Sequence, residues 1–161
     1  MKRKIAVCFM VIVLLLGLMC GCDLSKQESV YTDYSKIGGD SDSFSYSYCN
    51  GGTENTELSM TFEGFSGYDT LWIIDAKEKG TLTVDFESKI DSGKFKVVLV
   101  TPNREVKNLF EQSQKDSVTI DIEKGRYRIK IVGHKSKGEV TGAIKTNGDM
   151  EITEAEAFGN W

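Results

Sequence analysis

Residues 118–131 read VTIDIEKGRYRIKI, which is two alternating runs on either side of a Lys-Gly turn. Apolar side chains occupy every second position of both runs: Val118, Ile120, Ile122, Tyr127, Ile129 and Ile131. Alternation with a period of two places successive side chains on opposite faces of an extended chain. The stretch therefore predicts two half-buried β-strands.

The connection at Lys124-Gly125 has two interpretations. In a two-residue hairpin, Glu123 faces Arg126 and the apolar side chains of both runs share one face. In a corner, the chain crosses from one sheet to the other and Tyr127 pins the turn. Both arrangements place the same side chains in the core, so the pattern leaves the choice open.

Similar segments recur on both sides of this stretch. They cover residues 58–62, 71–74, 82–86, 95–100, 105–110 and 140–144. Turn-forming residues such as Gly64, Gly93, Pro102 and Gly138 separate them. The spacing of about 11 residues is typical of sandwiches and barrels. We predict an all-β fold, an antiparallel and jelly-roll-like β-sandwich of about eight strands.

Three of these stretches carry a resemblance to a known family. Residues 80–86 (GTLTVDF), 93–103 (GKFKVVLVTPN) and 118–131 are similar to the pre-peptidase C-terminal type of jelly-roll domain and to small Gram-positive lipoproteins that contain it. Lys79 and Arg104 stand where the family pattern has a turn aspartate and a turn glycine. The resemblance spans about half of the chain. It implies a sheet-crossing corner at Lys124-Gly125 and no catalytic residues, because its motifs are structural.

The first residues are typical of an export signal. Three basic residues at positions 2–4 precede an apolar run from Ile5 to Met19. That run is shorter than the roughly 20 residues of a membrane-spanning helix, and it ends in Gly21-Cys22, which resembles the bacterial lipobox. Cys20 is a rival acceptor, although the bulky Met19 precedes it. We expect cleavage after Gly21 and acylation of Cys22, which would anchor the protein on the extracytoplasmic face of the cell membrane.

The residues after the leader divide into three parts. Residues 22–54 are rich in Ser, Asp, Gly and Tyr, which predicts a flexible polar tether. Within it, the alternation of Phe44, Tyr46 and Tyr48 is also compatible with a short edge strand. Residues 55–152 form the predicted sandwich and residues 153–161 a C-terminal tail.

Charge and cysteine content exclude two classes of protein. Once the three basic residues of the leader are removed, 17 basic and 24 acidic residues remain. The resulting formal charge of −7 opposes binding to nucleic acid. Cys49 would be the only thiol left, so an internal disulfide scaffold is excluded. Whether Cys49 stays a free thiol is open. We expect a monomer.

The sequence holds few candidates for chemistry. His134 is the only histidine, it has no Cys/His partner motif, and we interpret it as a solvated loop residue. We therefore expect no catalytic residue, no metal and no cofactor. Phe65, Tyr68 and Trp72 lie close together in the sequence. They form either a sugar-binding aromatic platform or part of the core, and the core is the favoured interpretation because large aromatics in apolar runs are mostly buried.

These observations predict a non-enzymatic, lipid-anchored envelope protein. Its β-sandwich would mediate adhesion, ligand binding or assembly with a membrane partner at the cell envelope. The alternative is a carbohydrate-binding module that acts on wall or external glycans. Exposed, coplanar aromatics on one sheet would favour this alternative, whereas a smooth polar surface would favour the first interpretation.

Overall fold

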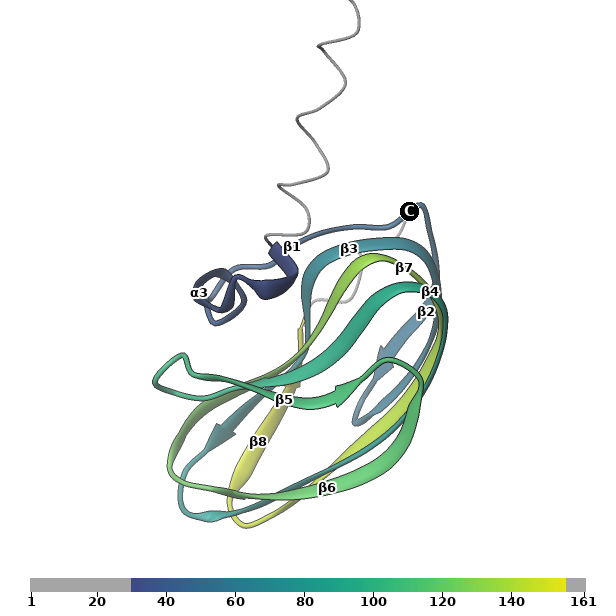
Figure 1. Ribbon diagram of the computed structural model, residues 1–161. Coiled ribbons are helices and arrows are strands. Elements are labelled where there is room, and N and C mark those ends of the chain that lie inside the picture. The colour runs from purple at the N-terminus through teal and green to yellow at the C-terminus, as the bar shows by residue number, and fades with distance from the viewer. Residues whose placement is uncertain (1–29, 156–161) are drawn as a thin grey trace, which may run out of the picture.

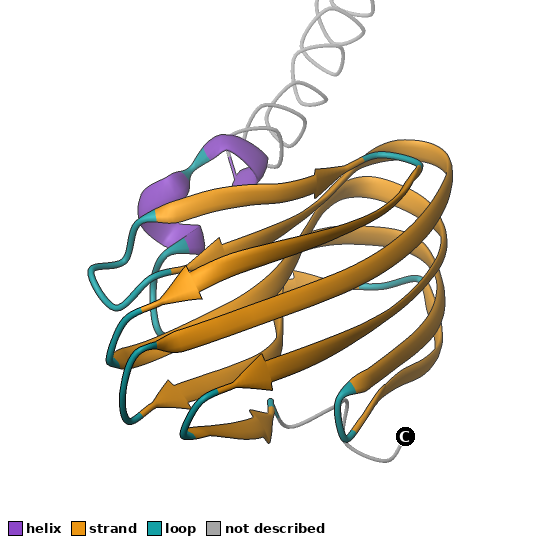
Figure 2. Cartoon of the chain, turned by 90° about the horizontal axis from the view of Figure 1, so that it is seen from below, coloured by secondary structure: helices purple, strands orange, loops and turns teal. Residues whose placement is uncertain are grey.

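The computed structural model describes residues 30–155, which contain a short helical segment before the first strand and eight antiparallel strands. Helix α3 covers Tyr34–Ile37. The strands are β1 (Ser43–Ser45), β2 (Tyr48–Glu54), β3 (Glu57–Ala76), β4 (Gly80–Val100), β5 (Val106–Glu111), β6 (Gln114–Ile122), β7 (Gly125–Asn147) and β8 (Met150–Glu154). The predicted all-β sandwich class is confirmed (Figures 1 and 2).

Three long strands, β3, β4 and β7, bend and take part in both layers of the sandwich (Figure 1). Layer A has the strand order β2-β3-β7-β4-β6 and uses the start of β3, the start of β4 and the end of β7. Layer B has the order β8-β3-β7-β4-β5 and uses their other halves, with β1 beside β3 at the same edge as β8. The molecule is therefore a sheet folded over on itself.

The bends fall where the sequence predicts turns between separate strands. Register shifts interrupt the pairing between Phe62 and Gly67 in β3 and between Ile90 and Lys94 in β4. Gly64 and Gly93 have φ values of 65° and 80°, and a Cβ on Gly93 would lie 2.3 Å from the carbonyl oxygen of Lys135. Bulges and left-handed glycines turn a strand without ending it. Six of the runs expected as separate strands therefore merge in pairs into β3, β4 and β7, and two remain separate as β5 and β6. Strands β1, β2 and β8 complete the eight.

The junction at Lys124-Gly125 is a corner. Strand β6 pairs with β4 in layer A, whereas the start of β7 pairs with β3 and β4 in layer B. The Tyr127 hydroxyl accepts a hydrogen bond of 3.2 Å from the backbone N–H of Glu123, which closes the corner. Of the two arrangements that the sequence allows, the chain adopts the sheet crossing.

The main core lies between the two layers and consists of the inward-facing positions of every long strand. Trp72 is fully buried there, and its indole N–H donates a 2.9 Å hydrogen bond to the carbonyl of Asn55 in the β2–β3 turn. Stacked and edge-on rings of Phe62, Phe65, Phe86 and Phe95 fill the bend region. This aromatic packing holds the folded-over sheet closed.

The segment before β3 differs from the expected flexible tether over residues 22–54. From residue 30 onward it contains α3, β1 and β2, and the remainder of the predicted tether lies outside the described residues. Tyr31 and Ile37 are buried against Tyr68, Val98 and Val132 on the outer face of layer B. The reason is that the outer face of layer B also carries apolar side chains, and covering them removes this apolar surface from water.

Candidate functional site

A groove of about 850 Å³ lies on the outer face of layer A. Its floor is formed by outward-facing residues of the three long strands, Ser59, Thr141 and Glu87. Strand β2 lines one side with Gly51 to Glu54, and β6 lines the other with Lys115 to Ser117. Since β-strands supply every wall, the lining residues are held more precisely than residues on loops would be.

Two further hollows continue this groove along the strands. The next, of about 350 Å³, shares Ser59, Glu87 and Thr141 with the first and adds Thr61 and Glu139. A third, of about 120 Å³, shares those two residues with the second and reaches Glu63 and Lys137. From Glu57 to Glu63 a strand covers about 20 Å. The outer face of layer A therefore offers a trough suited to an extended ligand.

Most of the side chains that line the trough are polar or charged. The Asp85 carboxylate accepts a hydrogen bond of 2.5 Å from the Ser117 hydroxyl and one of 3.2 Å from Lys145. These two bonds hold the pKa of Asp85 below its usual range. Glu87 pairs with Lys115 at 2.7 Å. Carboxylates, hydroxyls and an ammonium group stand side by side, so the trough can accept and donate hydrogen bonds over its whole width.

The structure buries all three candidate aromatic residues. Phe65 and Trp72 are fully buried in the main core, and Tyr68 is 6% exposed under the N-terminal segment on the opposite layer. They do not form an exposed platform, so the sugar-platform interpretation of these residues is not retained. Cys22, the expected acylation site, lies outside the described residues.

Sequence reasoning missed a buried polar cluster at the edge of layer B. Asp69 is 7% exposed, and the Tyr46 hydroxyl donates a 3.1 Å hydrogen bond to its carboxylate. Burial, together with the nearby charge of Asp42, raises the pKa of Asp69 to about 7. The cluster lies away from the trough, since neither residue lines it. The sequence feature that could have indicated this cluster is the position of Asp69 next to the apolar run 71–74, because residues beside such a run are often buried with it.

His134 and Cys49, the histidine and the thiol considered above as candidates for chemistry, both lie in strands. His134 pairs with Lys94 inside the continuous strand β7 and is half-buried, so the prediction of a solvated loop residue is wrong. The cause is that Gly133 and Gly138 occupy positions along a bent strand instead of ending it. Cys49 is a half-buried free thiol in β2, and burial raises the pKa of this thiol, which disfavours the reactive thiolate.

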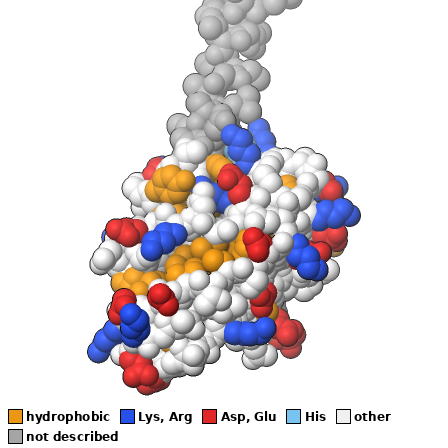
Figure 3. Space-filling model, turned by 60° about the horizontal axis from the view of Figure 1, so that its bottom comes forward, with side chains coloured by type: hydrophobic (Ala, Val, Ile, Leu, Met, Phe, Trp, Pro, Cys, Tyr) orange, Lys and Arg blue, Asp and Glu red, His pale blue; other side chains and the backbone are white. Residues whose placement is uncertain are grey.

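Residues 30–155 hold no cluster of three or more His, Cys, Asp or Glu side chains that would bind a metal ion. Within the same range, no helix has the length and apolar character needed to cross a bilayer. A band of hydrophobic side chains is visible in a hollow on the face shown in Figure 3, flanked by charged side chains. Half-buried Leu109 of β5 and Val118 and Ile120 of β6 pack against the main core where the two layers open.

Comparisons with known proteins identify similar folds but no family. No protein-family model matches the sequence, and no curated protein is significantly similar to it. The resemblance to the pre-peptidase C-terminal family therefore remains an expectation.

Among solved structures, a family 35 carbohydrate-binding module from an environmental isolate aligns with a TM-score of 0.36 and 18% identity over 75% of this chain and 93% of its own. A family 29 carbohydrate-binding module aligns with a TM-score of 0.33 and 13% identity over 68% and 82%. A family two carbohydrate esterase from Cellvibrio japonicus aligns with a TM-score of 0.39 and 14% identity, over 73% of this chain and 37% of the esterase. These are likenesses of fold.

Proposed function

We propose that this protein is a non-catalytic binding module whose trough on layer A holds an extended, polyhydroxylated polymer such as a wall or external glycan. An acylated Cys22 would hold it at the extracytoplasmic face of the cell membrane, as its leader predicts. The observation that carries the proposal is the long trough on layer A, which β-strands build and which polar and charged side chains line. Glycan binding, the alternative function for this sequence, is thus the leading proposal. The proposed binding surface is the trough on layer A and not the buried aromatic residues Phe65, Tyr68 and Trp72.

The chemistry of the trough supports a ligand with many hydroxyl groups. A hydroxyl donates one hydrogen bond and accepts two, so it can satisfy carboxylates and an ammonium group at once. Ser59 and Thr141 add hydroxyls of their own on the floor, and Gly52 leaves open space above β2, because a Cβ there would meet no atom within 4 Å. The trough spans more than one hollow, which favours a polymer over a single small sugar.

The state of the carboxylates supports binding without turnover. Glycoside hydrolysis needs one carboxylic acid with a raised pKa beside a second, ionised carboxylate. In the trough, Asp85 has a lowered pKa and Glu87 is paired with Lys115. Asp69, whose pKa is raised, does not line the trough. Asp85 with its lowered pKa is therefore poorly suited to act as the proton donor of such a reaction.

The test is binding of the full chain to peptidoglycan, wall polysaccharides and external glycans by calorimetry, with Thr141→Trp as the probe. Thr141 is exposed on a strand, so an indole is tolerated there and fills the floor of the trough. We expect the substitution to weaken binding by at least about tenfold, or about 1.4 kcal/mol.

The matched control is Asn108→Trp, which places an indole on an exposed strand position of layer B and should leave affinity unchanged. Equal weakening by both variants, or turnover of any glycan, would overturn the proposal. Binding to an envelope protein without any glycan binding would also overturn it, in favour of the first interpretation of the sequence.

A further inference from the structure

The N-terminal segment of the described chain, residues 30–42, lies across the outer face of layer B and is here called the strap (Figures 1 and 2). Ile37 is fully buried and Tyr31 is 6% exposed against Val98, Val100 and Val132. Gly38 packs so closely on the β4–β5 turn that a Cβ would lie 2.5 Å from the carbonyl oxygen of Arg104. The strap is therefore fitted to the sandwich surface.

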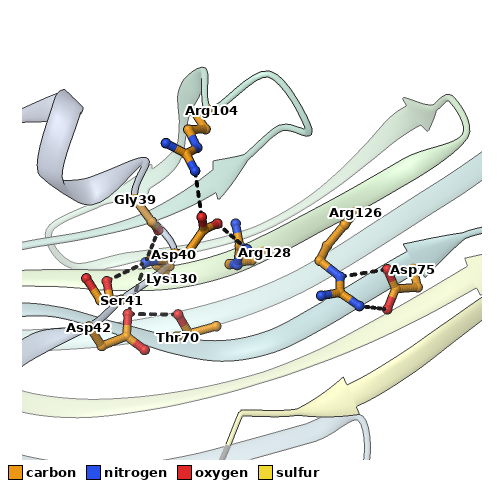
Figure 4. Close-up of polar contacts among 10 residues, drawn as sticks. All are labelled: Gly39, Asp40, Ser41, Asp42, Thr70, Asp75, Arg104, Arg126, Arg128 and Lys130. Carbon is orange, nitrogen blue, oxygen red and sulfur yellow. Dashed lines mark hydrogen bonds and ion pairs between the residues drawn. The ribbon is translucent and has the colours of Figure 1, made fainter.

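Charged groups tie the end of the strap to β7 and to the β4–β5 turn (Figure 4). Asp40 forms ion pairs of 2.6 Å with both Arg128 and Arg104, and these two guanidinium groups hold the pKa of Asp40 below its usual range. The Lys130 side chain is completely buried, and its ammonium group donates to the Gly39 carbonyl at 3.0 Å and to the Asp42 carboxylate at 3.0 Å. A buried ammonium group needs such partners, so the strap completes this site.

Aromatic rings tie the start of the strap to β4. The ammonium group of Lys96 lies 4.5 Å from the ring centroid of Tyr31 and 4.6 Å from that of Tyr34. Lys96 is 2% exposed, so these cation–π contacts are made in a site with little water, where they are strongest. The strap is thus held at both ends by independent contacts.

The strap and the trough lie on opposite faces of the molecule. The strap covers Val98, Val132 and Lys130, which alternate with core residues of layer B. The trough uses Ser59, Glu87 and Thr141, which alternate with core residues of layer A. The whole main core separates the two surfaces, so the chain reaches the sandwich from the side away from the trough.

We propose that the strap is an orienting clamp that turns the trough away from the membrane, toward polymers that lie beyond the protein. This inference rests on the proposed anchoring at Cys22. Only eight residue steps separate Cys22 from Val30, which span at most about 26–29 Å when fully extended. A domain held so closely and entered from one fixed face presents that face to the bilayer in preference to the opposite one for as long as the strap stays in place.

The first experiment measures hydrogen exchange in the full chain. The amides of Asp33 and of residues 36–39 donate backbone hydrogen bonds and should be protected. The double substitution Asp40→Asn with Asp42→Asn should lower this protection by at least about tenfold while β7 stays protected. The control is Asp75→Asn, which removes the 2.8 Å pair with Arg126 in the same layer but outside the strap (Figure 4). Unprotected amides in the wild-type strap, or an equal effect of the control, would refute the clamp.

The second experiment measures orientation in the lipidated protein, reconstituted in vesicles that carry an energy-transfer acceptor on the lipid headgroups. In a Cys49→Ser background, a dye is attached through Thr141→Cys in the trough or through Asn108→Cys on layer B. We expect more transfer from position 108, and a smaller difference between the two sites after the double substitution.

Equal transfer from both sites in the protein with an intact strap, or greater transfer from position 141, would overturn the orientation. Failure of the proposed function has a different signature. A protein that does not float with vesicles lacks the anchor, and a protein that binds no glycan in solution lacks the ligand, whereas both properties would persist if only the clamp were absent.

Discussion

Asp69 illustrates at the residue scale how the fold changes the properties of an ordinary carboxyl group. The group sits among apolar side chains with Tyr46 as its hydrogen-bond donor, while Asp42, Cys49 and Lys130 are the nearby titratable groups. Desolvation outweighs the favourable contacts, so the pKa of Asp69 rises from 3.8 to about 7. The folded protein consequently binds a proton that the unfolded chain releases near pH 4.

This shift gives the pH dependence a definite sign. The stabilising contribution of protonated Asp69 is complete at acidic pH and is lost as the pH rises from about 4 through about 7. Each pKa unit corresponds to about 1.4 kcal/mol. We expect Asp69→Asn to remove this slope, so that urea titrations at pH 5 and pH 8 differ less for the variant than for the wild type. Identical slopes would contradict the buried, neutral state of Asp69.

At the scale of the elements, β6 and β7 show how the position of a strand in the sheet sets the contribution of its side chains to the free energy of unfolding. Ile129 lies in β7, which is paired on both sides, and is fully buried, whereas Ile120 lies in the edge strand β6 and is half-buried. We expect Ile129→Ala to lower the free energy of unfolding by about 2–5 kcal/mol and Ile120→Ala by clearly less. Chemical denaturation of both variants measures the difference, and equal losses would mean that the edge of layer A is as closely packed as the centre of layer B.

At the scale of the whole molecule, the direction of the trough depends on how the chain is held. The leader predicts that Cys22 is acylated after cleavage at Gly21. We expect Cys22→Ala to abolish acyl labelling in cells and to leave an unprocessed precursor, because the acceptor thiol is lost. Acyl labelling that persists in Cys22→Ala but disappears in Cys20→Ala would place the attachment at the neighbouring cysteine instead.

Period-two patterns predicted the class of the fold because they record which side chains each strand buries. The alternations at 58–62, 82–86 and 127–131 lie in strands with their apolar residues in the core, as expected, whereas Val118 and Ile120 in β6 are only half-buried. The same local patterns could not reveal that β3, β4 and β7 continue through their glycines, since a bend and a turn use the same residues. They also did not predict the strap, whose few apolar residues are buried only because layer B offers them a surface.

The residues of the trough had no distinctive signature, because Ser59, Glu87 and Thr141 are simply the outward-facing members of their strands. By itself the sequence determined the all-β class, most of the core and the predicted export leader, since these depend on side-chain polarity along a local stretch. Only the tertiary structure decided the corner at Lys124-Gly125, the burial of Trp72, the raised pKa of Asp69 and the trough. These features depend on which strands become neighbours, and that choice joins residues that lie far apart in the chain, such as Ser59 with Thr141 and Gly39 with Lys130.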